Sequence, residues 1–335
     1  MAKCDYLITG LGALANERVT AISIADEQGN KGDKATITLD DRDFMLAAPP
    51  IGQIFSVSIG YTGADAIPLQ QIGTYQLDER SYTLDSGSGK TIQISGNAQH
   101  HVGNSIKAPR TETYEEKTLF EIFGYLAVRN GYIPNITAKI GANYYDHIVQ
   151  ESQSDLAFIS EVADKHDGYL KFENGKMSIK SRNETEGEVT LLGKAMGQIP
   201  IGQGAMLTVP SNVRFTESSR TNYKSCKVHW NNEDKGERLS ETIGSGEAQY
   251  EIKNAFQNKP LALVGGSAKL EQLARGTGEI SFTVPGDPGI KAGIKLIVPG
   301  GFRQEMTGEY IIRSVTHTMN SSGYITSGSG DRDMT

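Results

Sequence analysis

The chain has 335 residues, which is longer than most single domains and predicts about two or three of them. Its 38 glycines and its 37% of hydrophobic residues favour many short strands and turns over a helical bundle. The formal net charge of -7, with no block rich in lysine or arginine, argues against stable nucleic-acid binding, and no apolar run is long enough to predict a membrane segment.

Residues 1–96 carry the alternation of apolar and polar residues that is typical of strands with one buried face. Stretches rich in glycine, serine and aspartate separate these strands and predict turns. We therefore expect a mainly antiparallel β-domain here. The expected strands cover 19–25, 35–39, 55–61, 75–77 and 91–95.

Residues 97–185 change to helical spacing and predict an α+β module inserted into the β protein. A capping box at Thr118 should begin one amphipathic helix, and Ser152 should cap a second. Asn174 and Gly175 then lie between two short strands, and this dipeptide is the strongest local signal for a tight hairpin turn. The module is expected to pack its two helices on its own hairpin.

Residues 186–335 return to the strand period and predict a second β-domain with connecting segments. Within it, residues 267–275 predict one short helix, and the polar stretch 231–250 predicts a surface loop. The segment 327–335 at the end is polar and rich in glycine, so we expect it to be unpacked unless a partner orders it.

The two β regions share an ungapped similarity at a fixed offset of 235 residues. A repeat of this kind predicts two similar β-domains in one chain. Three such chains would present six similar surfaces, which could join a six-fold object to a three-fold one. The matched positions are Gly73 and Gly308, Tyr75 and Tyr310, Thr83 and Thr318, Asp85 and Asn320, and Ser86 and Ser321.

Asp40, Asp41, Arg42 and Asp43 follow an alternating strand and allow three interpretations: a strand exit, an acid/base pair or a metal site. Aspartate at a strand exit is solvated and accepts local backbone hydrogen bonds. An acid/base pair needs one carboxyl group shielded from water, and a cation needs further oxygen ligands that this segment lacks. We favour the strand exit, so no catalytic residue is expected here.

Neither a metal site nor a cofactor is expected elsewhere in the chain. The histidines show no ligand spacing, and no nucleophile elbow or phosphate-binding motif is present. Cys4 and Cys226 are too few and too far apart for a disulfide framework, and we expect reduced thiols. The histidines are His100, His101, His147, His166, His229 and His317.

Several spaced blocks carry a more specific signal. They read ITLDDRD followed by FSVSIGY, then GNSIKAPRTETYEEKTLFEIFGYLAVRNGY, QESQSDLAFISEVADKHDGYLKF and GDPGIKAGIKLIVPGGFRQEMTGEYIIRSVTHTMNSSGYITS. In this order they resemble the late control protein D family of contractile-tailed phages over most of the chain. In architecture alone, the chain is similar to the N-terminal hub part of type VI secretion spike proteins.

The resemblance implies a non-enzymatic baseplate hub: a homotrimer with two tail-tube-like antiparallel β-barrel or sheet domains in each chain. Such a trimer would adapt a hexameric tail tube, or its initiator protein, to a trimeric central spike. The spike is expected to be a separate protein, because the chain stops soon after the second β region. Baseplate wedge proteins are further expected partners and a tape-measure protein is another candidate. The protein would act in the baseplate of a virion or a phage-like bacteriocin, assembled in the host cytoplasm.

Ring contacts between chains are expected on the strands within 35–61 and 279–303, and spike contacts in the C-terminal half. Two other classes of function stay open: a tail-tip enzyme that hydrolyses peptidoglycan, and a monomeric carbohydrate-binding β module. The lack of a convincing pair of separated carboxylates counts against the enzyme. The candidate ring-interface residues are Ile37, Leu39, Phe55, Val57, Ile59, Phe282, Val284, Ile294 and Leu296.

Overall fold

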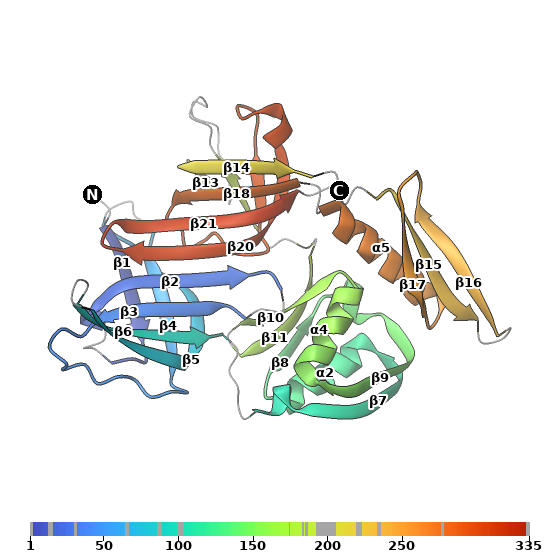
Figure 1. Ribbon diagram of the computed structural model, residues 1–335, viewed down its shortest axis with the longest axis horizontal. Coiled ribbons are helices and arrows are strands. Elements are labelled where there is room, and N and C mark those ends of the chain that lie inside the picture. The colour runs from blue at the N-terminus through green and yellow to red at the C-terminus, as the bar shows by residue number, and fades with distance from the viewer. Residues whose placement is uncertain are drawn as a thin grey trace.

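The computed structural model is mainly β, with two β-units and two smaller modules (Figure 1). None of the described helices combines the length and apolarity that crossing a membrane requires. The structure describes residues 3–332 except 13–15, 30–31, 64–66, 86–88, 99–103, 174, 183, 185–186, 192–205, 219–222, 233–235 and 276–277.

The first β-unit is an antiparallel sheet in the order β1-β4-β5-β6-β3-β2. Its strands alternate buried and partly exposed residues, and the buried ones form one hydrophobic cluster, as the sequence period predicts. The strands are β1 (Lys3–Thr9), β2 (Val19–Glu27), β3 (Lys34–Asp40), β4 (Ile54–Thr62), β5 (Gln70–Asp85) and β6 (Gly89–Asn97).

The inserted module contains both predicted helices, packed against a small sheet. Thr118 and Glu121 form the predicted capping box of α2. The second helix is capped by Ser154, because Ser152 still belongs to the preceding strand. Gly175 adopts a positive φ of 77° at the predicted hairpin turn; its neighbour Asn174 lies outside the described residues. The elements are η1 (Asn104–Lys107), β7 (Pro109–Thr118), α2 (Leu119–Arg129), β8 (Ile133–Ile136), α3 (Ala138–Gly141), β9 (Tyr144–Ser154), α4 (Asp155–Lys165), β10 (Gly168–Glu173) and β11 (Lys176–Ser181).

The second β-unit is built around β18, β19 and the long hairpin of β20 and β21. The prediction that the C-terminal segment is unpacked is wrong for residues 327–332. These residues belong to β21, which pairs with both β18 and β20. A central strand tolerates this polar, glycine-rich sequence because neighbouring strands satisfy its backbone on both sides. The elements are β12 (Glu188–Leu191), β13 (Met206–Thr208), β14 (Asn212–Glu217), β18 (Gly278–Pro285), β19 (Lys295–Val298), η2 (Gln304–Met306), β20 (Gly308–Asn320) and β21 (Gly323–Arg332).

A second small module interrupts this unit, and here two sequence expectations are wrong. The described part of the polar stretch 231–250 contains the whole strand 237–244 and the ends of two neighbouring strands, because Leu239 and Ile243 pack against a hydrophobic cluster while Ser240 and Thr242 are exposed. The predicted short helix is 17 residues long, since Asn258 caps it and its glycine pair allows close packing against β15 and β17. The elements are β15 (Ser225–Asn232), β16 (Glu237–Gly244), β17 (Gln249–Phe256) and α5 (Lys259–Arg275).

The repeat is confirmed by the strand order. β3, β6, β5 and β4 pair in the same order as β18, β21, β20 and β19, and every one of these pairs is antiparallel. Tyr75 lies opposite Phe55, and its counterpart Tyr310 lies opposite Leu296. The two units therefore share strand order and register.

Finer details of the two units also coincide. The register of β5 against β6 shifts at Asp78, and that of β20 against β21 shifts at Arg313, which is the same offset of 235. Next to each shift lies a glycine, Gly96 or Gly330, at which an added Cβ would lie 2.7 Å from the carbonyl oxygen of the opposing strand. Close backbone approach therefore requires glycine at both places.

The two units join through β2 and the C-terminal half of β20, which pair antiparallel. We call this contact the in-chain joint. It produces one continuous run of strands, β14-β18-β21-β20-β2-β3-β6-β5, which Figure 1 shows from top to bottom. This run ends in β14 on one side and in residues 79–84 of β5 on the other, while residues 70–76 of β5 continue to β4 and β1.

Candidate assembly surface

The nine residues proposed for ring contacts all lie inside the chain. Each side chain is at most 6% exposed and belongs to one of the two β-unit cores. Eight of them lie in β3, β4, β18 and β19, which pair with neighbours on both sides, and Ile294 directly precedes β19. These side chains are therefore core residues within the chain, and a ring contact on the strands that carry them stays a prediction. Alternation in a sequence identifies a buried face but does not separate a chain core from an interface between chains.

The aspartate cluster lies where β3 leaves the sheet, as expected. Arg42 pairs with Asp40 at 2.7 Å, and Arg18 pairs with Asp43 at 2.5 Å. Hydrogen bonds from these arginines hold the pKa of both carboxyl groups below the usual range of aspartate. The Asp41 carboxylate accepts a bond from the backbone N–H of Leu46 and orders the turn. Permanently ionised, arginine-paired carboxylates cannot serve as general acids at neutral pH.

The histidines that the structure describes do not gather into a metal site. Within the described part of the chain, no cluster of three or more histidine, cysteine or acidic side chains could hold an ion. His147 lies near Glu115, and the ring of His229 contacts Glu251. His100 and His101 lie outside the described residues. Both cysteines are free thiols, and Cys226 is buried.

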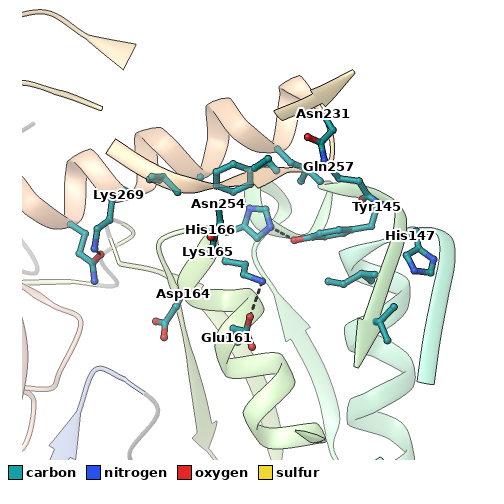
Figure 2. A pocket seen from close by; sticks show the side chains of 18 residues that line it. Tyr145, His147, Glu161, Asp164, Lys165, His166, Asn231, Asn254, Gln257 and Lys269 are labelled. Atoms are coloured by element: carbon teal, nitrogen blue, oxygen red, sulfur yellow. Dashed lines mark hydrogen bonds and ion pairs between the residues drawn. The ribbon is translucent and has the colours of Figure 1, made fainter. Parts of the chain in front are cut away.

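A cavity of about 760 Å³ lies between the inserted module and the second small module (Figure 2). Its polar centre is His166, whose Nε2 lies 2.6 Å from the Tyr145 hydroxyl. Burial lowers the pKa of His166 to about 4 and raises that of Tyr145, so both are neutral at pH 7. Glu161 and Lys165 form an ion pair of 2.8 Å at the rim. Two carboxylates line the cavity, and both are held in ion pairs: Glu161 with Lys165, and Asp164 with Arg182 at 3.0 Å.

A buried charge cluster fastens the inserted module to the in-chain joint. Lys171 of β10 is 5% exposed, and its Nζ lies 2.5 Å from Asp26 of β2 and 3.5 Å from Asp33. Burial lowers the pKa of Lys171, but the two carboxylates outweigh burial and raise it overall. Burial and the neighbouring Asp26 raise the pKa of Asp33 to about 7. Asp26 also accepts a bond from the backbone N–H of Ala292 in the second unit.

We expect the in-chain joint to weaken in acid through His317. This side chain is fully buried opposite Ile24, and burial lowers its pKa to about 4. The unfolded chain, with an ordinary histidine pKa of about 6.5, therefore binds the proton first, and stability is lost as pH falls from about 6.5 towards 4. The loss attributable to His317 should approach about 3 kcal/mol. Urea unfolding at several pH values measures this loss. Between pH 6.5 and 4 the free energy of unfolding should fall less for His317→Gln than for the unsubstituted chain, and an equal fall in both proteins would contradict the prediction.

The sheet ends expose side chains that the sequence analysis did not select. On β5, Tyr82 is 62% and Leu84 is 73% exposed. β4 pairs only with residues 70–76 of β5, so residues 79–84 have a strand neighbour on the β6 side alone within the described structure. β14, which carries the half-buried Phe215, likewise pairs only with β18 among the described strands. The repeat is the signal that could have identified both edges.

Two known proteins are similar to the chain over 93% of its length, and both are named probable baseplate hub protein. The one from Escherichia phage P2 is 22% identical, and the match covers 88% of that protein. The one from Escherichia phage 186 is 20% identical, with 87% covered. No family model matches the chain.

Solved structures give the same picture for the fold. A 43 kDa tail protein of prophage MuSo2 from Shewanella oneidensis superposes with a TM-score of 0.70 at 14% identity, covering 98% of both chains. The Escherichia coli protein c3393, a component of the type VI secretion system, has a TM-score of 0.61 at 10% identity, covering 98% of this chain and 77% of that one. The chain is thus similar in sequence to phage baseplate hub proteins and has the fold of phage tail proteins, as its resemblance to the late control protein D family indicated.

Proposed function

We propose that the chain is the structural hub of a contractile-tail baseplate, and that three copies form an adaptor between a hexameric tube and a trimeric spike. The observation that carries this proposal is the duplicated β-unit within one continuous sheet. Three copies of a chain with two equivalent units repeat that unit six times around one axis. A trimeric spike would then meet the three-fold features of the same ring.

The role is mechanical rather than enzymatic. The relatives from phages P2 and 186 are named probable baseplate hub proteins, and two of the three aspartates in the acidic cluster of this chain, Asp40 and Asp43, pair with arginines. Hydrolysis of a glycosidic bond usually needs two separated carboxyl groups, one with a raised pKa. The two described aspartates whose pKa is raised, Asp33 and Asp331, are both largely buried and lie beside Lys171 and Arg313. They fit structural ion pairs better than an open cleft.

The proposed partners follow from this place in a tail. They are a tail tube or tube-initiator protein on the six-fold side and a central spike protein on the three-fold side. Baseplate wedge proteins would contact the periphery, where the two small modules project from the β-units in Figure 1. A tape-measure protein would lie in the channel, and the protein would reside in the baseplate of the assembled particle.

Light scattering coupled to size-exclusion chromatography tests the proposal. The purified chain should elute with three times its mass of 36.3 kDa, alone or with its spike protein, and averaged electron micrographs should show a ring with six similar lobes. A monomer under all these conditions would reject the hub. Release of muropeptides from purified cell walls by the monomer would instead favour the enzyme, and saccharide affinity would favour the binding module.

A further inference from the structure

The in-chain joint provides a template for a second joint that no single chain can form. β2 contributes the side that does not pair with β3. β20 contributes residues 314–319, which lie beyond the part of the strand that pairs with β19. The counterpart of that half of β20 is residues 79–84 of β5, at the offset of 235. We call these residues the β5 edge.

The counterpart of β2 is β14. Gly96 and Gly330 mark equivalent positions in β6 and β21. In the first unit, Gly96 lies opposite Ala35, which lies opposite Ile24 of β2. In the second unit, Gly330 lies opposite Ile280, which lies opposite Phe215 of β14, so Phe215 is the equivalent of Ile24. The free side of β14 in the described structure is therefore the equivalent of the side of β2 that pairs with β20.

We propose that β14 of one copy pairs antiparallel with the β5 edge of the next copy, in the register of the in-chain joint. This inference rests on the proposed trimer and names the surface that closes it. In the template, Ile24 lies opposite His317. The expected pairs between copies are Val213 with Leu84, Arg214 with Thr83, Phe215 with Tyr82, Thr216 with Ser81, and Glu217 with Arg80.

The exposed fractions match this arrangement. Tyr82 and Leu84 are 62% and 73% exposed, whereas their counterparts His317 and Met319 are 0% and 5% exposed because β2 covers them. Unpaired strand edges with large apolar side chains readily accept another strand. A neighbouring β14 would bring its own apolar residues, Val213 and Phe215, onto the same face. The partner that fits the β5 edge is thus a second copy of this chain.

The two joints balance their charged residues differently. In the in-chain joint, Asp26 faces Val315, and its charge is balanced by the buried Lys171. In the joint between copies, the position of Asp26 is taken by Glu217 and that of Val315 by Arg80, so the opposite charges would face each other across the strands. Since both residues are exposed in the chain, this joint should be more sensitive to salt than the in-chain joint.

Each copy offers one β14 and one β5 edge, so the contact is head to tail. Contacts of this kind close into a ring when the rotation between copies divides a full turn, and a closed ring leaves neither β14 nor the β5 edge free. If the joint between copies repeats the geometry of the in-chain joint, three copies give six alternating joints around one axis. The ring then satisfies the backbone of β14 and of the β5 edge in every copy.

Oxidative cross-linking tests the register in the full chain, with Cys4→Ser and Cys226→Ala as background. Arg214→Cys with Thr83→Cys should give covalent dimers and trimers on a denaturing gel, because paired strand positions lie within disulfide range. Moving one partner two residues along the same face, Arg214→Cys with Ser81→Cys, should cross-link at least tenfold less. Ser23→Cys with Thr318→Cys, the matched pair of the in-chain joint, should cross-link only within one chain.

Light scattering on the same samples separates the possible failures. A trimer that cross-links equally in both registers, or in neither, would overturn the inference and leave the hub proposal standing. A monomer under all conditions would reject both. Should the first cysteine pair prevent folding, Thr216→Cys with Ser81→Cys probes the same register, and its cross-linking supports or overturns the inference in the same way. Independently, Leu84→Lys should convert trimers to folded monomers, whereas Val128→Lys, at a site 65% exposed on α2, should not.

Discussion

Replacing Lys171 with alanine is expected to lower the free energy of unfolding by about 3–5 kcal/mol. The substitution leaves the carboxylates of Asp26 and Asp33 close together in a buried site without their cation. Because Asp26 lies in β2 and also binds the backbone of Ala292, the loss should loosen the inserted module and the in-chain joint together. Urea unfolding followed by circular dichroism measures the change.

Two controls separate charge from shape in this cluster. Lys117→Ala removes an exposed lysine that pairs with Glu121 at 3.5 Å, and it should cost no more than about 0.5 kcal/mol. The triple substitution Lys171→Met, Asp26→Asn and Asp33→Asn should recover much of the lost stability, because no unpaired charge remains. If Lys171→Ala is as mild as Lys117→Ala, the cluster does not hold the modules together.

Replacing Arg129 with alanine should destabilise the inserted module by a similar amount, about 3–5 kcal/mol. Its guanidinium joins the C-terminus of α2 to Asp155 at the start of α4, at 2.5 Å, and to Glu112 of β7, at 2.6 Å. Asp155 is fully buried, so removal of the arginine leaves an ionised carboxyl group without its main partner. Hydrogen exchange should show the loss of protection in residues 104–181 first.

Lys165→Ala provides the matched comparison in the same module. Lys165 pairs with Glu161 one turn along α4, but both side chains are about half exposed. Exposed pairs at this helical spacing contribute about 0.3–0.5 kcal/mol. Equal effects of Arg129→Ala and Lys165→Ala, or a loss of protection spread evenly over the chain, would argue that the Arg129 network is not what locks α2 to α4.

Local patterns predicted the elements whose signals are short-range. The capping box at Thr118, the turn at Gly175 and the strand exit at Asp40 each depend on residues a few positions apart, and the structure contains all three. The helix α5 was predicted too short because Ser267 is itself a good capping residue, whereas Asn258 caps the helix in the structure. The pair Gly265 and Gly266 then allows β15 and β17 to approach the helix, a contact that no local pattern encodes.

The amino-acid sequence alone predicted a repeated β-unit, because an offset of 235 residues aligns Tyr75 with Tyr310. The structure confirms it, since both tyrosines are core residues at equivalent register positions. Which strands end the sheet became clear only in the folded chain. Leu39 and Leu84 both alternate with polar neighbours in the sequence, but Leu39 is covered by its own chain and Leu84 is not. The two differ because burial depends on which strand lies alongside, and strand neighbours are set by long-range pairing that a period of two does not record.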